Sequence, residues 1–243
     1  MTTVRIFSSK ACAAPIQAAS EVFERETGIK VERSMCGRHC QEGEAGNAGD
    51  LKGHHFLEEI AEAGIHDIAV GGAEYLLDDG EAAGIVQRGK RLVLALRKSA
   101  LIVPADNPAG IRGLDDLKRP GVRVGISIVD CLRGVWEDVC GRAGILSDVV
   151  KNIAVHANGC MAIIEATAQK KVDAAFGWHG FEHLAPGRIK AIAIPDRFCV
   201  YRGTGAGLLS FSREPAAAEK LMAFLASERS RPFFTELGWV VRP

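Results

Sequence analysis

Short apolar runs alternate along the first half of the chain with segments whose apolar residues recur at helical spacing. Ile16, Ala19, Val22 and Phe23 share one face of a predicted helix that ends at Thr27. Two more predicted helices cover residues 56–64 and 73–84. Runs typical of strands are VRIF, IKVERS, HDIAVGG and RLVLALRKSALIVP, at residues 4–7, 29–34, 66–72 and 91–104. The last run is long enough for one or two strands.

The second half continues the alternation. Strands are predicted at residues 122–127, 152–157, 172–178, 189–195 and 199–212, and helices at 114–121, 132–144, 160–171, 215–227 and 231–238. Strands that alternate with helices predict an α/β fold with mostly parallel sheets, which bind ligands at the carboxyl ends of the strands. Because the alternation runs twice, we expect two lobes. Residues 41–55 are rich in glycine and charge and predict a loop.

Charge and hydropathy exclude two classes of function. Lys and Arg number 30, as do Asp and Glu, so no basic surplus points to nucleic acid. No run reaches the ~18 apolar residues that a membrane helix needs, so we expect no membrane insertion. The first strand begins too early to leave room for a signal peptide. The sequence as written therefore predicts a cytoplasmic protein, or a periplasmic one if a leader has been removed.

Seven cysteines are the unusual feature of the composition. Their number is odd and they are spread along the chain, which does not suit a small disulfide scaffold. Cys140 and Cys199 lie in apolar surroundings and are predicted core residues. The group Cys36, His39 and Cys40 could be a metal site, a redox pair or two buried thiols. These residues alone do not decide between the three.

The order of these segments resembles that of a known family. The strongest pieces are VRIFSSKACAAPIQAASEVFERETGIKV, HDIAVGGAEYLLDDGEAAGIV, VRVGIS, KKVDAAFGW and the ending SREPAAAEKLMAFLASERSRPFFTELGWV. They resemble type II periplasmic solute-binding proteins, most of all the molybdate-binding proteins of ABC transporters. The resemblance implies mixed sheets flanked by helices, with a ligand cleft between the lobes. Lobe 1 would comprise residues 1–95 and 199–243 and lobe 2 residues 96–198, with hinge strands near 91–97 and 195–202.

The resemblance also implies a ligand site. Proteins of this family hold an oxyanion on small polar side chains and on backbone N–H groups at helix N-termini, two from each lobe. The matching positions are Ser8, Ser9, Cys12, Cys36 and Gly37 in lobe 1, and Cys131, Cys160 and Trp178 in lobe 2. Trp178 stands where the family often has a ligand-contacting tyrosine. A cysteine therefore occurs at each of the four turns that would line the cleft.

Thiolates at helix N-termini favour soft metals, because the helix dipole lowers the thiol pKa. Cys12, Cys36, Cys131 and Cys160 are therefore predicted metal ligands, with Cys40 and His39 as possible additions. Four thiolates suit zinc or an iron–sulfur cluster, and three would suit arsenite. A [4Fe–4S] cluster fills a wide cleft better than one zinc ion, and its complex has the net charge of the dianion that the family binds. The cluster is thus the preferred cofactor and zinc the alternative.

Three functions stay open. The preferred one is carriage or sensing of a thiophilic metal species by a protein that is not an enzyme. The second is an oxyanion-binding component of an ABC transporter, with a permease as partner. The third is a redox enzyme that uses a cleft cluster or the Cys36 and Cys40 pair. His54 and His55 lie in the predicted loop, where a histidine is more often solvated, and His179 and His183 are expected to be structural.

Overall fold

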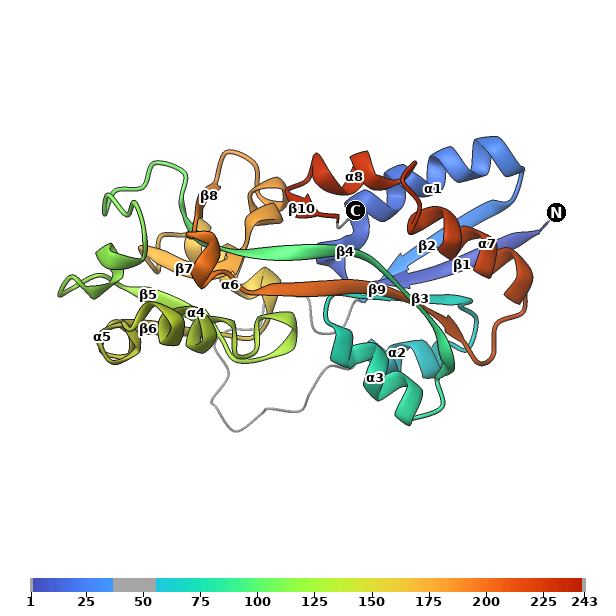
Figure 1. The fold of residues 1–243 in the computed structure, drawn as a ribbon, viewed down its shortest axis with the longest axis horizontal. Helices are drawn as coiled ribbons and strands as arrows, with labels where there is room; N and C mark the ends of the chain where they lie inside the picture. The colour runs from blue at the N-terminus through green and yellow to red at the C-terminus, as the bar shows by residue number, and fades with distance from the viewer. Residues whose placement is uncertain (1, 37–55, 242–243) are drawn as a thin grey trace. The chain divides into compact units, whose positions relative to one another are not determined.

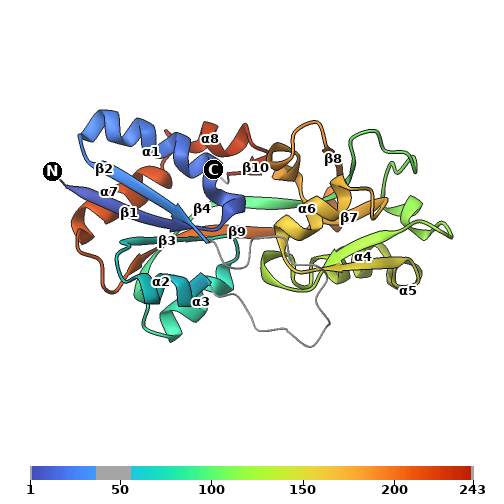
Figure 2. The same ribbon diagram turned by 180° about the vertical axis from the view of Figure 1, so that it is seen from behind.

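A computed structural model describes residues 2–36 and 56–241, and the chain divides into two compact units. Of the described residues, 2–36, 56–96 and 202–241 form unit 1, and 97–201 form unit 2. The chain passes from unit 1 to unit 2 inside the long strand β4 (Val86–Pro104). It returns at the start of β9 (Tyr201–Leu209). Figures 1 and 2 label these elements.

Unit 1 is a sheet with helices on both faces. Its strands are β1 (Thr3–Ser8), β2 (Lys30–Met35), β3 (Ile68–Gly71) and β9, in the order β2-β1-β3-β9, with β4 next to β9. β1 is parallel to β2 and β3, whereas β9 is antiparallel to β3. Both views show α1 (Ala13–Thr27) and α7 (Pro215–Leu225) on one face and α2 (Phe56–Ala63) and α3 (Glu74–Ala82) on the other (Figures 1 and 2). α8 (Arg231–Thr235) and β10 (Trp239–Val240) complete the unit.

The core of unit 1 follows from the alternation of residues along its strands and from the helical spacing of apolar residues in its helices. Alternate residues of β1, Val4 and Ile6, point from the sheet into a buried apolar cluster. Ile16, Ala19 and Phe23 of α1 join that cluster, as the helical spacing predicts. α1 stops at Gly28, whose φ of 69° suits a residue without a Cβ.

Asp67 joins strand β3 to helix α7 through a fully buried carboxylate. The side chain is 1% exposed. Its Oδ1 accepts hydrogen bonds from Ser212 Oγ at 2.7 Å and from the backbone N–H groups of Arg213 at 2.9 Å and Glu214 at 3.2 Å. Its Oδ2 accepts a hydrogen bond from the Arg5 N–H at 2.8 Å. The carboxylate thus satisfies donors just before α7, where no local side chain acts as a cap.

Unit 2 has a second mixed sheet. β5 (Val124–Ser127) is parallel to β6 (Ile153–Ala157) and to β7 (Ala174–Trp178). β4 is antiparallel to β7 and to β8 (Ile189–Ala193). The helices are α4 (Val135–Ala143), α5 (Leu146–Val150) and α6 (Cys160–Ala168). Five 3-10 turns in the whole described chain are η1 (Lys10–Cys12), η2 (Leu114–Lys118), η3 (Asp130–Leu132), η4 (His179–Leu184) and η5 (Asp196–Phe198).

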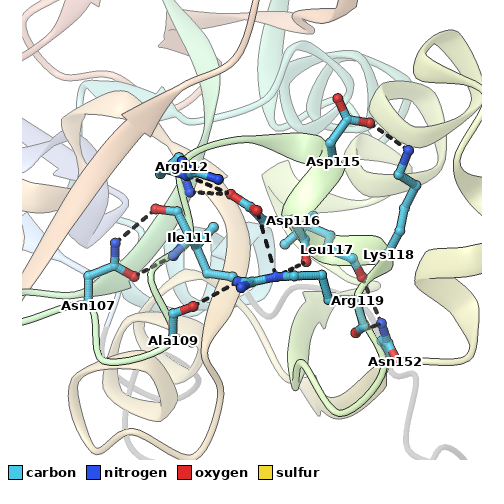
Figure 3. A network of polar contacts seen from close by, with 10 residues as sticks. All are labelled: Asn107, Ala109, Ile111, Arg112, Asp115, Asp116, Leu117, Lys118, Arg119 and Asn152. Atoms are coloured by element: carbon cyan, nitrogen blue, oxygen red, sulfur yellow. Dashed lines mark hydrogen bonds and ion pairs between the residues drawn. The ribbon is translucent and has the colours of Figure 1, made fainter.

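The segment between β4 and β5 is held by a network of polar contacts (Figure 3). The Asn107 side chain accepts a hydrogen bond from the Ile111 N–H at 3.0 Å and donates one to the Ile111 carbonyl at 2.8 Å. Asn152 Nδ2 donates to the carbonyls of Leu117 at 2.7 Å and Arg119 at 2.9 Å. These contacts satisfy backbone groups that no strand or helix serves, and they fix the entry into β5.

The predicted α/β fold with mixed sheets and flanking helices is confirmed, and several details differ. The run at 91–104 is part of one strand of 19 residues. Residues 114–118 form a 3-10 turn instead of a regular helix. Cys199 was predicted inside a strand, but it lies between η5 and β9, because Pro195 and Asp196 start a turn and regular strand structure begins again at Tyr201. No helix among the described residues is long and apolar enough to cross a bilayer.

We predict that Asp67→Ala lowers the free energy of unfolding by roughly 3 kcal/mol or more, because four donors lose their buried, charged acceptor. The measurement is urea unfolding at neutral pH, followed by circular dichroism. The control is Asp115→Ala, since the Asp115 side chain is 90% exposed and its loss should change stability by about 0.5 kcal/mol at most. Equal stabilities of the two variants would contradict the role given to Asp67.

Candidate functional site

Two cysteines of unit 2 meet at the ends of neighbouring strands. β5 ends at Ser127, and Cys131 lies in the 3-10 turn that follows. β6 ends at Ala157, and α6 starts at Cys160. Because β5 and β6 are parallel neighbours, their carboxyl ends lie at one edge of the sheet. The two Sγ atoms are 2.9 Å apart.

Gly159 lies just before Cys160, at the N-cap of α6. Its φ of 94° with ψ of −178° is a conformation that favours glycine. Its N–H donates a hydrogen bond to Ser127 Oγ at 3.3 Å, which links the start of α6 to the end of β5. Ser127 is 2% exposed.

The sulfur of Cys131 accepts hydrogen bonds from two large buried side chains. Arg97 Nη1 donates to it at 3.0 Å and Trp178 Nε1 at 3.2 Å. The Arg97 guanidinium also lies over the Trp178 ring, 4.7 Å from its centroid. Arg97, Trp178 and Cys131 are 3%, 1% and 5% exposed. A positive charge is therefore held inside unit 2, at the carboxyl ends of β5 and β7.

These contacts set the charge of Cys131. Burial alone would raise the pKa of its thiol, but the hydrogen bond with Cys160, the charge of Arg97, and the hydrogen bonds from Trp178 and Arg97 together lower that pKa to about 6. Cys131 is therefore mainly a thiolate at neutral pH. Cys160 is partly exposed and is the first residue of α6, a position where the helix dipole favours negative charge.

Unit 1 has a comparable arrangement at the ends of β1 and β2. Ser8 is the last residue of β1, and its carbonyl accepts a hydrogen bond from the Cys36 N–H at 3.0 Å. Ser9 Oγ donates to the sulfur of Cys12 at 3.0 Å, and Cys12 is the residue that caps the start of α1. Ser8, Cys12 and Cys36 are buried. Hydroxyl and thiol groups thus gather where two parallel strands end.

The structure places each described cysteine of the predicted site at the strand end that the sequence indicates. Cys12 and Cys36 belong to unit 1, whereas Cys131 and Cys160 belong to unit 2. Within the described ranges, no three His, Cys, Asp or Glu side chains are grouped so that they could hold a metal ion. A site built on all four cysteines stays a prediction. Gly37, His39, Cys40, His54 and His55 lie outside the described residues.

Four further residues considered in the sequence are described by the structure, namely Cys140, Cys199, His179 and His183. Cys140 and Cys199 are buried, as the sequence predicts. Burial raises the pKa of the Cys140 thiol to about 12 and also raises that of Cys199. His179 and His183 lie in η4, directly after β7.

Sequence reasoning missed Arg97. It sits in the apolar run that forms β4, and a charged residue inside such a run could have been noticed as a candidate functional group. Its neighbour in the sequence, Lys98, forms an ion pair with the exposed carboxylate of Asp196 at 2.5 Å. The alternation of sides along a strand separates the two charges, so that Arg97 is buried and Lys98 is partly exposed.

Two α/β units whose polar groups collect at the carboxyl ends of the strands define a solute-binding fold. The family model described as "Bacterial extracellular solute-binding protein" matches residues 4–240. The chain therefore belongs to the bacterial extracellular solute-binding protein family. A comparison with curated protein sequences gives no match.

Solved structures of similar proteins agree with this fold. PEB3 of Campylobacter jejuni, in a structure with bound L-phospholactate, is 20% identical, with a TM-score of 0.80 over 98% of this chain and 100% of that one. The periplasmic molybdate-binding protein of Azotobacter vinelandii is 17% identical, with a TM-score of 0.74 over 99% and 100%. The sulfate-binding protein SubI of Mycobacterium tuberculosis is 15% identical, with a TM-score of 0.78 over 100% and 88%. At these identities the likeness shows the fold.

We predict that Cys131 titrates with a midpoint at about pH 6. The measurement is thiolate absorbance near 240 nm, recorded from pH 4 to 9 as the difference between the unaltered protein and Cys131→Ser. About nine-tenths of the Cys131 signal should be present at pH 7. Cys140→Ser is the control and should keep the midpoint, because the Cys140 thiol does not ionise in this range. A midpoint in the ordinary range, ~8.5, would contradict the roles of Arg97 and Trp178.

The same pKa makes stability depend on pH. Because folding lowers the pKa of Cys131 from its usual value, the thiolate contributes stability that is complete above that usual value and is lost as the pH falls to about 6. The free energy of unfolding of the unaltered protein should therefore fall over this window relative to that of Cys131→Ser. Urea unfolding at several pH values would measure the difference.

Proposed function

We propose that this chain captures a small oxyanion and delivers it to the permease of an ABC transporter. The observation that carries the proposal is the buried guanidinium of Arg97, which lies against Cys131 in unit 2. A buried cation is costly unless anions or strong acceptors lie close to it. Cys131 supplies one such acceptor, and an oxyanion bound beside the guanidinium would interact favourably with the same charge. Family membership supports the general role of solute binding.

The groups around Arg97 suit an oxyanion in chemical type. Its guanidinium offers several N–H donors in one plane, a pattern that matches the oxygens of molybdate, sulfate or phosphate. The first turn of α6, which starts at Cys160, supplies backbone N–H groups and the positive end of a helix dipole. Three similar structures are those of proteins named for molybdate or sulfate or holding L-phospholactate, all anions.

A thiophilic metal species is the second candidate. The contact between the sulfurs of Cys131 and Cys160 favours it, because two adjacent thiolates are good ligands for a soft metal. An iron–sulfur cluster or zinc would need further ligands, and the sequence assigns that role to Cys12 and Cys36. The oxyanion has the better support, since the similar structures include proteins named for molybdate and sulfate.

We predict that at least one of molybdate, tungstate, sulfate and phospholactate raises the melting temperature. Binding to the native state alone stabilises it by about 2.7 kcal/mol at 100 times the dissociation constant, which corresponds to roughly 5–10 °C for a chain of this length. Differential scanning fluorimetry gives the shift, and isothermal titration calorimetry gives the affinity and stoichiometry. The absence of a shift with all four anions would refute the proposal.

Arg97→Gln should weaken binding of the active anion about ten- to one-hundred-fold, the range expected for loss of a charge-assisted hydrogen bond. Arg97→Lys keeps the charge but not the planar donor pattern and should have an intermediate effect. Arg112→Gln is the matched control, because the Arg112 side chain is 87% exposed. Circular dichroism shows whether each variant folds. An unchanged affinity in folded Arg97→Gln would remove Arg97 from the site.

The metal candidate has its own test. If it is right, protein purified without oxygen should contain either one zinc per chain, or iron and sulfide with broad visible absorption. Single changes of Cys12, Cys36, Cys131 and Cys160 to serine should each remove most of this metal, because a hydroxyl is a poor soft-metal ligand. Cys140→Ser should retain it. We expect instead that the oxyanion proposal holds and that the protein is colourless with little bound metal. Metal analysis by mass spectrometry decides the question.

A further inference from the structure

The two sulfurs at the ends of β5 and β6 are closer than separate thiols need to be. They are 2.9 Å apart, and no disulfide bond joins them in this structure. A disulfide bond is about 2.05 Å long, so a shift of roughly 1 Å would join them. The sheet holds both residues in place, since Cys131 follows β5 and Cys160 follows its parallel neighbour β6.

We propose that Cys131 and Cys160 form a reversible disulfide, and that this disulfide controls how strongly Arg97 attracts an anion. The first part stands on the geometry of the two thiols alone. The second part rests on the proposed function, because it concerns the binding of an oxyanion next to Arg97.

Exchange with a small-molecule disulfide, such as glutathione disulfide, supplies the chemistry. Cys160 is the partly exposed member of the pair, so its thiolate attacks the small disulfide, breaks its S–S bond and releases one thiolate. Cys131 then attacks the Cys160 sulfur of the mixed disulfide and releases the second thiolate. The protons lost by the two cysteines end on the two released thiols. The protein loses two electrons, and the small disulfide gains them.

The contacts of Cys131 suit it to the second step. Arg97 Nη1 and Trp178 Nε1 both donate hydrogen bonds to its sulfur, and such donors favour the nucleophilic thiolate over the thiol. Cys131 is also buried, which keeps external reagents from it while Cys160 remains within reach. Among the described residues, the other cysteines of unit 2 are Cys140 and Cys199. Both are buried, and the Cys199 thiol donates a hydrogen bond to the Ile194 carbonyl at 3.2 Å.

The disulfide would change the charge next to Arg97. In the reduced protein, the sulfur of Cys131 is an anionic acceptor for the guanidinium. In a disulfide that sulfur is neutral and a weak acceptor, so the guanidinium keeps its charge while Cys131 no longer offsets it. An incoming oxyanion then no longer competes with a thiolate. We expect the oxidised protein to bind the oxyanion about tenfold more tightly, the effect of one charge-assisted contact.

Peptide mapping tests the first part on the unaltered protein. The protein is equilibrated with glutathione disulfide, alkylated under denaturing conditions and digested with trypsin, which places Cys131, Cys140 and Cys160 in the separate peptides 124–133, 134–142 and 152–170. We expect one linked pair, 124–133 with 152–170, that disappears after dithiothreitol. Cys140→Ser and Cys199→Ser should form the same pair. Glutathione adducts without that link, or a link to another cysteine, would overturn the proposal.

Titration with molybdate, or with whichever anion of the panel binds, tests the second part. The reduced protein, the oxidised protein and a Cys131→Ser/Cys160→Ser variant are compared. Tighter binding by the oxidised protein and the double variant than by the reduced protein is expected, because both lack the thiolate. Equal affinities would overturn the control of binding while leaving the disulfide and the proposed function intact. If neither redox form binds any oxyanion, the proposed function fails together with this control, and the mapped disulfide stands alone.

Discussion

The positive charge of a buried guanidinium needs acceptors close to it, and in unit 2 several strands bring such partners to Arg97. An unpaired charge of this kind costs several kcal/mol, which is why its partners are placed so closely. Cys131 supplies the acceptor and Trp178 the flat surface beneath the charge. Both partners come from the carboxyl ends of parallel strands, and Arg97 comes from the antiparallel strand β4. The arrangement therefore depends on three strands that keep a fixed register.

The same topological rule acts in both units. Parallel neighbours bring residues that are distant in the sequence to one edge of a sheet, as with Ser8 and Cys36 in unit 1 and Cys131 and Cys160 in unit 2. The following helices or 3-10 turns then present backbone N–H groups at the same edge. Side chains at these edges can be exchanged without altering the strands. Because the strands and the side chains at their ends can vary independently, one fold can hold ligands as different as those of the similar structures.

Most of the fold could be predicted from sequence because it depends on local periodicity. The helix containing Ile16, Ala19 and Phe23 and the short apolar strands have clear patterns, and the cysteines could be placed at strand ends. Arg97 could not be placed, because an apolar run does not show which side of a strand faces which neighbour. The contact between Cys131 and Cys160 also depends on the spacing between β5 and β6, which pattern alone does not give. The nature of the ligand depends on such contacts. The metal hypothesis rested on the positions of the cysteines in the sequence, without knowledge of these contacts.

Trp178 gives this protein an internal optical reporter. Its indole N–H lies 3.2 Å from the sulfur of Cys131, and a sulfur in such close contact quenches the fluorescence of an excited indole. The chain has only three tryptophans, and Trp178 is the buried one that touches a cysteine sulfur within the described sequence. Any event that moves or neutralises that sulfur should change the emission of this residue. Changes at the contact between Arg97 and Cys131 could then be followed in real time by the fluorescence of Trp178, without an added dye.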